Sequence, residues 1–262
     1  IHSLHESGSK LIIAVGGGSA MDVAKCIKLY ANMNHNENYL KQEIKENDIT
    51  LLAVPTTAGT GSEATRYAVI YYQGEKQSIN HISCIPSVVL FDSSLLETLP
   101  VYQKKATVLD ALCHSIESMW SVNSNEESKK YATEANQLIK THMSQYINED
   151  TSTYEIMLKA ANLAGKAINI TQTTAGHAMC YKITSLYGAS HGHAAALVNS
   201  VLLPYMLHNI DNCIDPRGKE YLKSVFEDIE KILGLRNQAE LEEFFEKILG
   251  EWNLYGITIN RN

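Results

Sequence analysis

Two short apolar runs in the first hundred residues predict buried strands, and each leads into a loop of small residues. Leu11-Ile-Ile-Ala-Val15 precedes a glycine triplet and Ser19, and Thr50-Leu-Leu-Ala-Val54 precedes a stretch rich in hydroxyls and glycine over residues 55–63. Short apolar runs bounded by turn residues are typical of buried strands. Residues 20–33 predict a helix after the first loop. Residues 68–72 and 87–91 predict further strands, whose parallel or antiparallel direction the pattern leaves open.

Beyond Pro100 the spacing of apolar residues becomes almost continuously helical. Turns are predicted near residues 123–125, 148–151, 188–190 and 216–218, where Asn, Gly, Pro and Ser gather. The sequence therefore predicts an α/β protein with two domains. A partial Rossmann-like dinucleotide-binding domain covers residues 1–98, and an all-α metal-binding domain covers residues 99–262.

The order strand, glycine loop, helix is a phosphate-binding arrangement. Glycines let the backbone approach a pyrophosphate closely, and the N–H groups at the positive end of the following helix receive its charge. Ser19 with Asp22 forms a capping-box pattern, which predicts that the helix begins at Ser19. A glycine triplet alone would favour a mere tight turn. Two such loops at the ends of parallel strands instead predict one dinucleotide site.

Four residues of the helical region form a candidate ligand set for a divalent metal ion. Asp110 and His114 lie one turn apart on a helix predicted around residues 104–120, so both side chains can reach one ion. His177 enters a helix over 178–187, and His191 stands in a glycine-flanked turn before a helix over 194–207. A single Asp/His pair is usually a surface pair, so the prediction rests on all four. One carboxylate and three imidazoles suit Fe(II), Zn(II) or Ni(II).

These motifs carry a family resemblance when they are taken in order. Residues 16–25, 55–63, 110–114 and 191–192 together resemble the iron-containing, group III alcohol dehydrogenase family. The resemblance covers residues from about 10 to 207. It implies a dehydroquinate synthase-like architecture, with the active site in the cleft between the two domains, and it favours Fe(II). It also implies that the four candidate ligands hold the metal and that the following residues bind NAD or NADP: Gly17, Gly18, Ser19, Asp22, Thr56, Thr57, Thr60, Ser62 and, by a looser match, Lys76.

The chain departs from the family at one position that bears on proton transfer. Many members carry a further histidine four residues after the position of His177, and here that residue is Tyr181. His193 is a substitute by type, because an imidazole can pass a proton to an alkoxide near neutral pH. A histidine that caps the following helix is an equally good interpretation of His193. Tyr181 either donates its phenol proton or simply packs.

The same departure indicates a branch of the family. Residues 169–187 and 65–72 resemble the phosphonoacetaldehyde reductase group, which reduces phosphonoacetaldehyde to 2-hydroxyethylphosphonate. A phosphonate needs cationic partners, and the net charge of −7 makes any local cationic pocket notable. Arg66, Lys166 and Lys182 are the substrate candidates. Each is, by residue type alone, more often a surface charge.

Composition fits a soluble globular enzyme in the cytoplasm, and the family resemblance implies a small aldehyde or alcohol as its substrate. The chain has 22 basic against 29 acidic residues and no basic run among aromatics, so its sequence shows no pattern typical of nucleic-acid binding. No apolar stretch approaches the ~20 residues of a membrane span. The five cysteines contain no Cys-x-x-Cys pair, which is typical of a reducing compartment. The sequence leaves open whether the protein forms a homodimer.

Three other interpretations stay open at this point. One is a general short-chain alcohol dehydrogenase of the same family. The others are a dehydroquinate synthase-like lyase and a non-catalytic fragment that binds metal. The chain begins at Ile1, close to the first glycine loop, and we expect an N-terminal strand–helix portion to be missing. The choice between NAD and NADP would depend on that portion.

Overall fold

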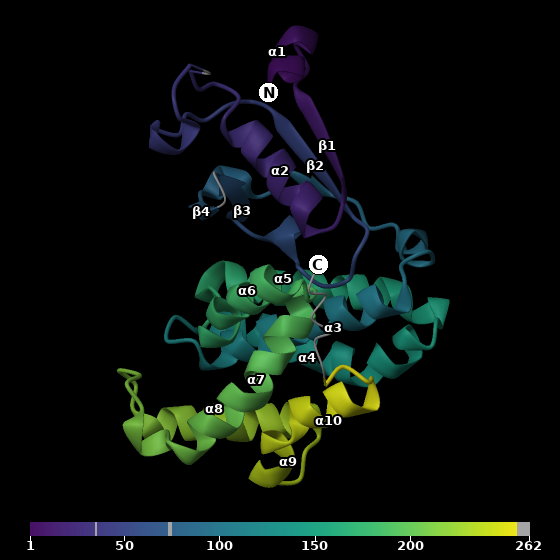
Figure 1. Ribbon diagram of the computed structural model, residues 1–262, viewed down its shortest axis with the longest axis vertical. Coiled ribbons are helices and arrows are strands. Elements are labelled where there is room, and N and C mark those ends of the chain that lie inside the picture. The colour runs from purple at the N-terminus through teal and green to yellow at the C-terminus, as the bar shows by residue number, and fades with distance from the viewer. Residues whose placement is uncertain (35, 73–74, 256–262) are drawn as a thin grey trace.

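The computed structural model describes residues 1–34, 36–72 and 75–255. Figure 1 shows an α/β region at one end, with N-terminal helix α1 (His2–Ser7), and a larger cluster of helices at the other. All five strands of the described chain precede Pro100, and the long helices from α3 onward follow it. The predicted fold class is therefore confirmed. The division into two domains at this point stays a prediction.

The three-stranded parallel sheet carries the first two loops at its carboxyl end. Its order is β1 (Leu11–Gly16), β2 (Thr50–Pro55) and β5 (Val88–Val89). The strand predicted at 87–91 is thus parallel and much shorter than expected. Helix α2 (Gly18–Leu29) packs on one face of the sheet, where its Met21 and Ala24 share a small core with strands β1 and β2.

An antiparallel hairpin extends from the second loop. Strands β3 (Tyr67–Tyr72) and β4 (Glu75–Asn80) pair from Tyr67↔Asn80 to Tyr72↔Glu75. Ala68 and Ile79 of this hairpin pack with Cys26 and Leu29 of α2 in a second small core. The hairpin therefore covers the side of α2 away from the sheet and brings its own residues toward the helical region.

The helical region is built around α3 (Val101–Trp120). Almost every residue of α3 from Ala106 onward is buried, because α4, α5 and α7 pack around it; a helix enclosed in this way lies inside the core. No helix in the described part of the chain has the length and apolar character to cross a membrane. The other helices are α4 (Glu126–Ile147), α5 (Tyr154–Thr171), α6 (Ala175–Tyr187), α7 (His191–His208), α8 (Lys219–Leu233), α9 (Gln238–Glu242) and α10 (Phe244–Glu251).

The second loop meets the helical region at two glycines. Gly61 has a φ of 58°, a left-handed conformation that suits glycine. A Cβ on Gly165 of α5 would lie 2.4 Å from the carbonyl oxygen of Gly61. Asn162, also on α5, donates to the buried carboxylate of Glu63 at 3.1 Å. These contacts fix the position of the loop relative to the helices.

The close approach of these backbones predicts the effect of a single methyl group. We expect Gly165→Ala to lower the free energy of unfolding by about 1–3 kcal/mol, because the loop or α5 must move. The affinity for nicotinamide nucleotide should fall as well, since Thr60 and Ser62 of this loop are predicted to bind the cofactor. Urea denaturation and nucleotide titration measure both effects. Exposed Lys166→Ala on the same helix is the matched control, and equal stability of the two variants would contradict the prediction.

Candidate active site

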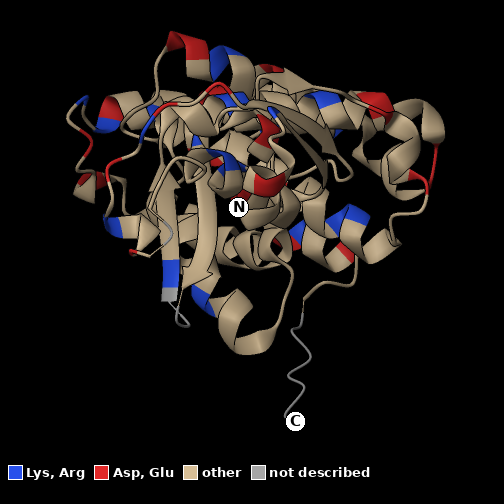
Figure 2. Ribbon diagram, turned by 90° about the horizontal axis from the view of Figure 1, so that it is seen from above, with Lys and Arg blue, Asp and Glu red and all other residues tan. Residues whose placement is uncertain are grey.

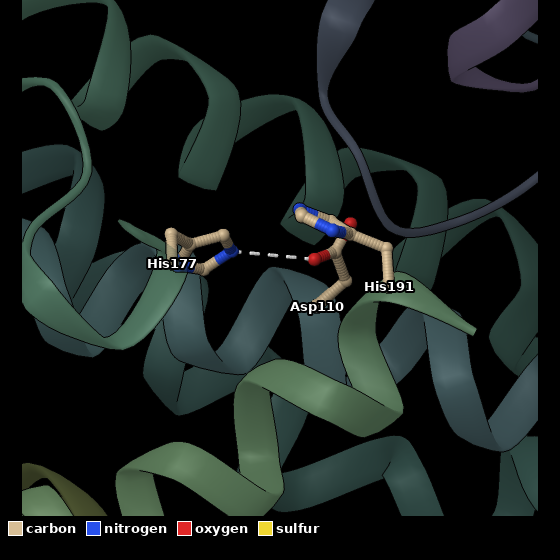
Figure 3. Close-up of side chains that lie close together, drawn as sticks. All are labelled: Asp110, His177 and His191. Atoms are coloured by element: carbon tan, nitrogen blue, oxygen red, sulfur yellow. Dashed lines mark hydrogen bonds and ion pairs between the residues drawn. The ribbon is translucent and has the colours of Figure 1, made fainter. Parts of the chain in front are cut away.

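Three helices bring the predicted ligands together. Asp110 and His114 lie one turn apart on α3, His177 lies in the first turn of α6, and His191 is the first residue of α7. Helix α7 thus begins three residues before its predicted start. Figure 3 shows His177 and His191 approaching the Asp110 carboxylate. One donor atom from each of these three residues lies within 4.8 Å of the others.

The donor set fits a divalent ion. The Asp110 Oδ1 atom lies 3.4 Å from His177 Nε2 and 3.9 Å from His114 Nε2. Metal bonds of about 2.0–2.2 Å in a tetrahedral site place neighbouring donors about 3.5 Å apart. The His114 ring stacks on His177 at 4.3 Å, and its Nδ1 has no hydrogen-bond partner among the described residues. These residues could therefore bind one ion after small side-chain movements.

Burial and neighbouring charges favour the charged, doubly protonated form for only one of the three imidazoles. Burial lowers the pKa of His114 to about 4 and also lowers the pKa of His191. Burial acts in the same direction on His177, yet the charge of Glu117 and hydrogen bonds to Asp110 and Glu117 raise the pKa of His177 to about 10. Burial disfavours the charge of Asp110, but the three histidines hold the pKa of this carboxyl below its ordinary value.

Glu117 contacts the site but is missing from the sequence prediction. Its side chain is fully buried, and its Oε1 atom lies 2.6 Å from His177 Nδ1. Burial would raise the pKa of Glu117, but the charge and hydrogen bond of His177 lower it to about 2. Its spacing could have revealed it, because residue 117 follows Asp110 by seven positions, which is two helical turns, and so lies on the same face of the helix.

The first loop has the shape expected for a phosphate site, although its helix begins differently from the prediction. Gly16 has a φ of 152°, and a Cβ there would lie 2.6 Å from that of Ala20. Helix α2 begins at Gly18 with Gly17 at the N-cap, and no side chain of the described residues caps it. The predicted capping box with Ser19 is therefore wrong. The first N–H groups of α2 are left for a ligand.

Asp22 makes contacts that connect the two loops instead of capping α2. Its carboxylate accepts hydrogen bonds from the Ser62 hydroxyl at 2.9 Å and from the Val69 N–H at 3.0 Å. Burial raises the pKa of Asp22, although the nearby Lys25 opposes this shift. Lys25 is itself buried and donates to Ser62 at 2.9 Å. This buried network holds the first loop, the second loop and the hairpin in place.

One cavity of about 800 Å³ connects the loops to the metal ligands. Gly17 and Thr57 pack against each other beside it, and Thr56 donates its N–H to Gly16. These three predicted cofactor residues do not line the cavity in the described part of the chain, whereas the other six do. The predicted site residues that line it are Gly18, Ser19, Asp22, Thr60, Ser62, Lys76, Asp110, His114, Tyr181 and His191.

The two candidates for proton transfer lie in different places. Tyr181 lines the cavity, and the centroid of its ring lies 4.9 Å from that of His191. The Lys76 Nζ atom lies over the Tyr181 ring, 2.8 Å from the ring centroid. His193 is 3% exposed and points elsewhere: its ring nitrogens contact the Tyr102 hydroxyl at 3.1 Å and the Leu254 carbonyl at 2.8 Å. The structure does not bring His193 to the site, so its predicted role as a proton shuttle is withdrawn.

The three substrate candidates also lie outside the cavity lining. Arg66 donates its N–H and guanidinium to Asn169 and so joins the hairpin to α5. Lys166 and Lys182 are exposed, and the Lys166 Nζ atom lies 5.8 Å from the centroid of the Tyr131 ring. Lys76 is the one lysine or arginine that lines the cavity within residues 1–34, 36–72 and 75–255. In the view of Figure 2, acidic and basic segments are interspersed.

Two family models match the chain. The model described as "Iron-containing alcohol dehydrogenase" matches residues 1–93. The model described as "Fe-containing alcohol dehydrogenase family, C-terminal" matches residues 104–253. The two matches fall on the α/β region and on the helical region, and together they include all of the predicted ligands.

Known proteins of the same kind are similar in sequence and structure. A phosphonoacetaldehyde reductase from Streptomyces viridochromogenes is 31% identical over 237 residues, which are 85% of this chain and 60% of that protein. A probable alcohol dehydrogenase, EutG, from Escherichia coli is 33% identical over 79% of this chain and 53% of its own length. A crystal structure of 1,3-propanediol oxidoreductase has a TM-score of 0.82 and 27% identity, covering 98% of this chain and 67% of that one. The chain thus spans about three fifths of the length of such relatives.

The charge distribution predicts that metal binding releases a proton. Because Glu117 and Asp110 raise the pKa of His177 to about 10, we expect both nitrogens of His177 to carry a proton at neutral pH in the ion-free protein. An ion that takes Nε2 must displace the proton on that nitrogen. We expect about one proton to be released per ion at pH 7, rather than none. Titration calorimetry in buffers of different ionisation enthalpy measures this number, and a buffer-independent heat would contradict the assignment.

Proposed function

The chain belongs to the iron-containing alcohol dehydrogenase family, and from this premise we propose that its protein interconverts an aldehyde and a primary alcohol. One observation carries the proposal. A single cavity is lined at one side by the N-terminal turn of α2 and at the other by the metal ligands. A dinucleotide and an ion held at these two places would both face a small molecule bound between them.

Membership of the family implies a metal and a nicotinamide cofactor, and we propose Fe(II) as the metal. When bound, the ion supplies Lewis-acid polarisation of a carbonyl, and the nicotinamide supplies the hydride. Asp110, His114, His177 and His191 would hold the ion. The N–H groups of the first turn of α2, with Ser19 and Thr60, would bind the cofactor phosphates.

We propose Tyr181 as the proton donor to the product oxygen. The phenol of Tyr181 is protonated at neutral pH, as an ordinary tyrosine is, and burial raises its pKa further. Its ring lies beside His191, on the cavity wall. A phenol hydroxyl in this position can supply the proton that the alcohol product needs.

The proposed substrate is phosphonoacetaldehyde. Its support is the resemblance of residues 169–187 and 65–72 to that branch, together with the 31% identity to a phosphonoacetaldehyde reductase. The positions of Arg66, Lys166 and Lys182 add no support. An uncharged short aldehyde is the competing substrate, because the second relative carries the general name of alcohol dehydrogenase.

Oxidation of NADH and NADPH tests the function directly. We expect the full-length protein, loaded anaerobically with Fe(II), to oxidise one of these cofactors with phosphonoacetaldehyde and to prefer it to uncharged short aldehydes. Absorbance at the nicotinamide band measures the rate. Activity on uncharged aldehydes alone would rule out phosphonoacetaldehyde as the substrate but would still support aldehyde reduction. No oxidation with any aldehyde would contradict the reaction class and favour a lyase or a non-catalytic protein.

Removing the phenol hydroxyl tests the role of Tyr181. We expect Tyr181→Phe to lower kcat about 10²-fold, within the range of general acid catalysis, with little change in the KM for aldehyde. Exposed Tyr205→Phe is the matched control. Steady-state kinetics measures both constants. A Phe variant with the kcat of the unchanged protein would remove Tyr181 from proton transfer.

A further inference from the structure

We infer that Glu117 is a positioning residue for the metal centre, which fixes the tautomer and direction of the His177 ring. The inference rests on the metal-dependent function proposed above. Glu117 touches no atom that would react, so its effect passes through His177. The observations that carry it are the contacts of the buried Glu117 carboxylate and the chemistry of the imidazole ring.

The contact between the two side chains selects one form of the imidazole. A neutral imidazole carries its proton on one nitrogen and offers the other as an acceptor or ligand. An ionised carboxylate only accepts, so the Nδ1 of His177, 2.6 Å from Glu117 Oε1, must donate. The lone pair of the neutral ring is then on Nε2. This atom faces Asp110 Oδ1 at 3.4 Å and therefore points at the place where the ion would bind.

The Glu117 carboxylate is itself held rigidly. Its Oε1 atom accepts from His177 Nδ1 and from the Asn199 amide at 3.0 Å. Its Oε2 atom accepts from the N–H and hydroxyl of Thr174, each at 2.7 Å, and from the His177 N–H at 3.4 Å. A buried carboxylate is stable only when hydrogen-bond donors such as these surround it. The side chain therefore has little freedom to turn away from His177.

The same arrangement predicts that glutamine is a poor substitute for this residue. Either orientation of a glutamine amide would place an NH₂ group where an oxygen now accepts at least two donors. An NH₂ group at the Oε1 position would donate to His177 Nδ1 and force the imidazole proton onto Nε2. The ring would then present an N–H to the ion instead of a lone pair.

The test compares metal affinity and coordination in matched variants of the full-length protein. We expect Glu117→Gln to bind Co(II) about 10- to 100-fold more weakly, measured by chelator competition, with a changed visible spectrum of the bound Co(II). Asn136→Ala is the control, because it removes a buried 2.7 Å hydrogen bond to Ser115 of α3 without touching a ligand. The control should keep the affinity and the spectrum of the unchanged protein.

Two results of this comparison would overturn the inference, and a third variant covers a failure to fold. One is a Glu117→Gln variant with unchanged affinity and spectrum, and the other is an equal loss of affinity in Asn136→Ala, which would reduce Glu117 to a structural contact between helices. If the glutamine variant does not fold, Glu117→Asp decides the question. It keeps the charge but withdraws the oxygen from Nδ1, so unchanged affinity in this variant would also overturn the inference. None of these measurements uses an aldehyde, so failure of the proposed reaction is separately visible.

Discussion

A buried carboxylate surrounded by hydrogen-bond donors holds together the three helices that carry the candidate metal ligands. Glu117 on α3 binds Thr174 and His177 at the start of α6 and Asn199 on α7. Because a buried ion must be satisfied by fixed partners, the three helices cannot slide relative to one another without leaving that charge unpaired. The positions of Asp110, His177 and His191 depend on this constraint, since each comes from a different one of these helices.

The α/β region is held by a second buried network of similar character. Asp22 and Lys25 on α2 connect the first loop to Ser62 in the second loop and to the hairpin backbone. The glycine contact between Gly61 and Gly165 then joins the second loop to α5. The two loops and the candidate metal ligands are thus parts of one connected arrangement, and residues of both line the same cavity.

Local patterns in the sequence predicted most of this framework. The strands β1 and β2, the glycine loop and the pair Asp110 and His114 are visible because each depends on residues within one or two turns or one strand. Together they were sufficient for the family and the fold class. The candidate ligands on α6 and α7 were proposed because their motifs have a fixed order along the chain, whereas the convergence of their side chains is a property of the packing.

The errors concern residues whose partners lie far away in the sequence. Asp22 was assigned to a helix cap, but Ser62 and Val69 take its carboxylate. His193 is two residues from a ligand, yet a helix turns about 200° over that distance, so its ring points away from the site. Arg66 looked like an anion anchor, but its guanidinium is used to bind Asn169. No spacing rule within one segment reveals such competition for a side chain.

The burial of the candidate metal ligands bears on the order in which an ion and a dinucleotide can bind. His177 is fully buried, and Asp110 and His114 are nearly so; among the described residues these last two, with His191, open onto the shared cavity. An ion that arrives through this cavity crosses the space that the dinucleotide would fill. With the proposed ion and dinucleotide in these places, the ion would have to bind before the nucleotide, and a bound nucleotide would cover it. Loss of metal during turnover would be limited to the intervals in which the nucleotide is exchanged.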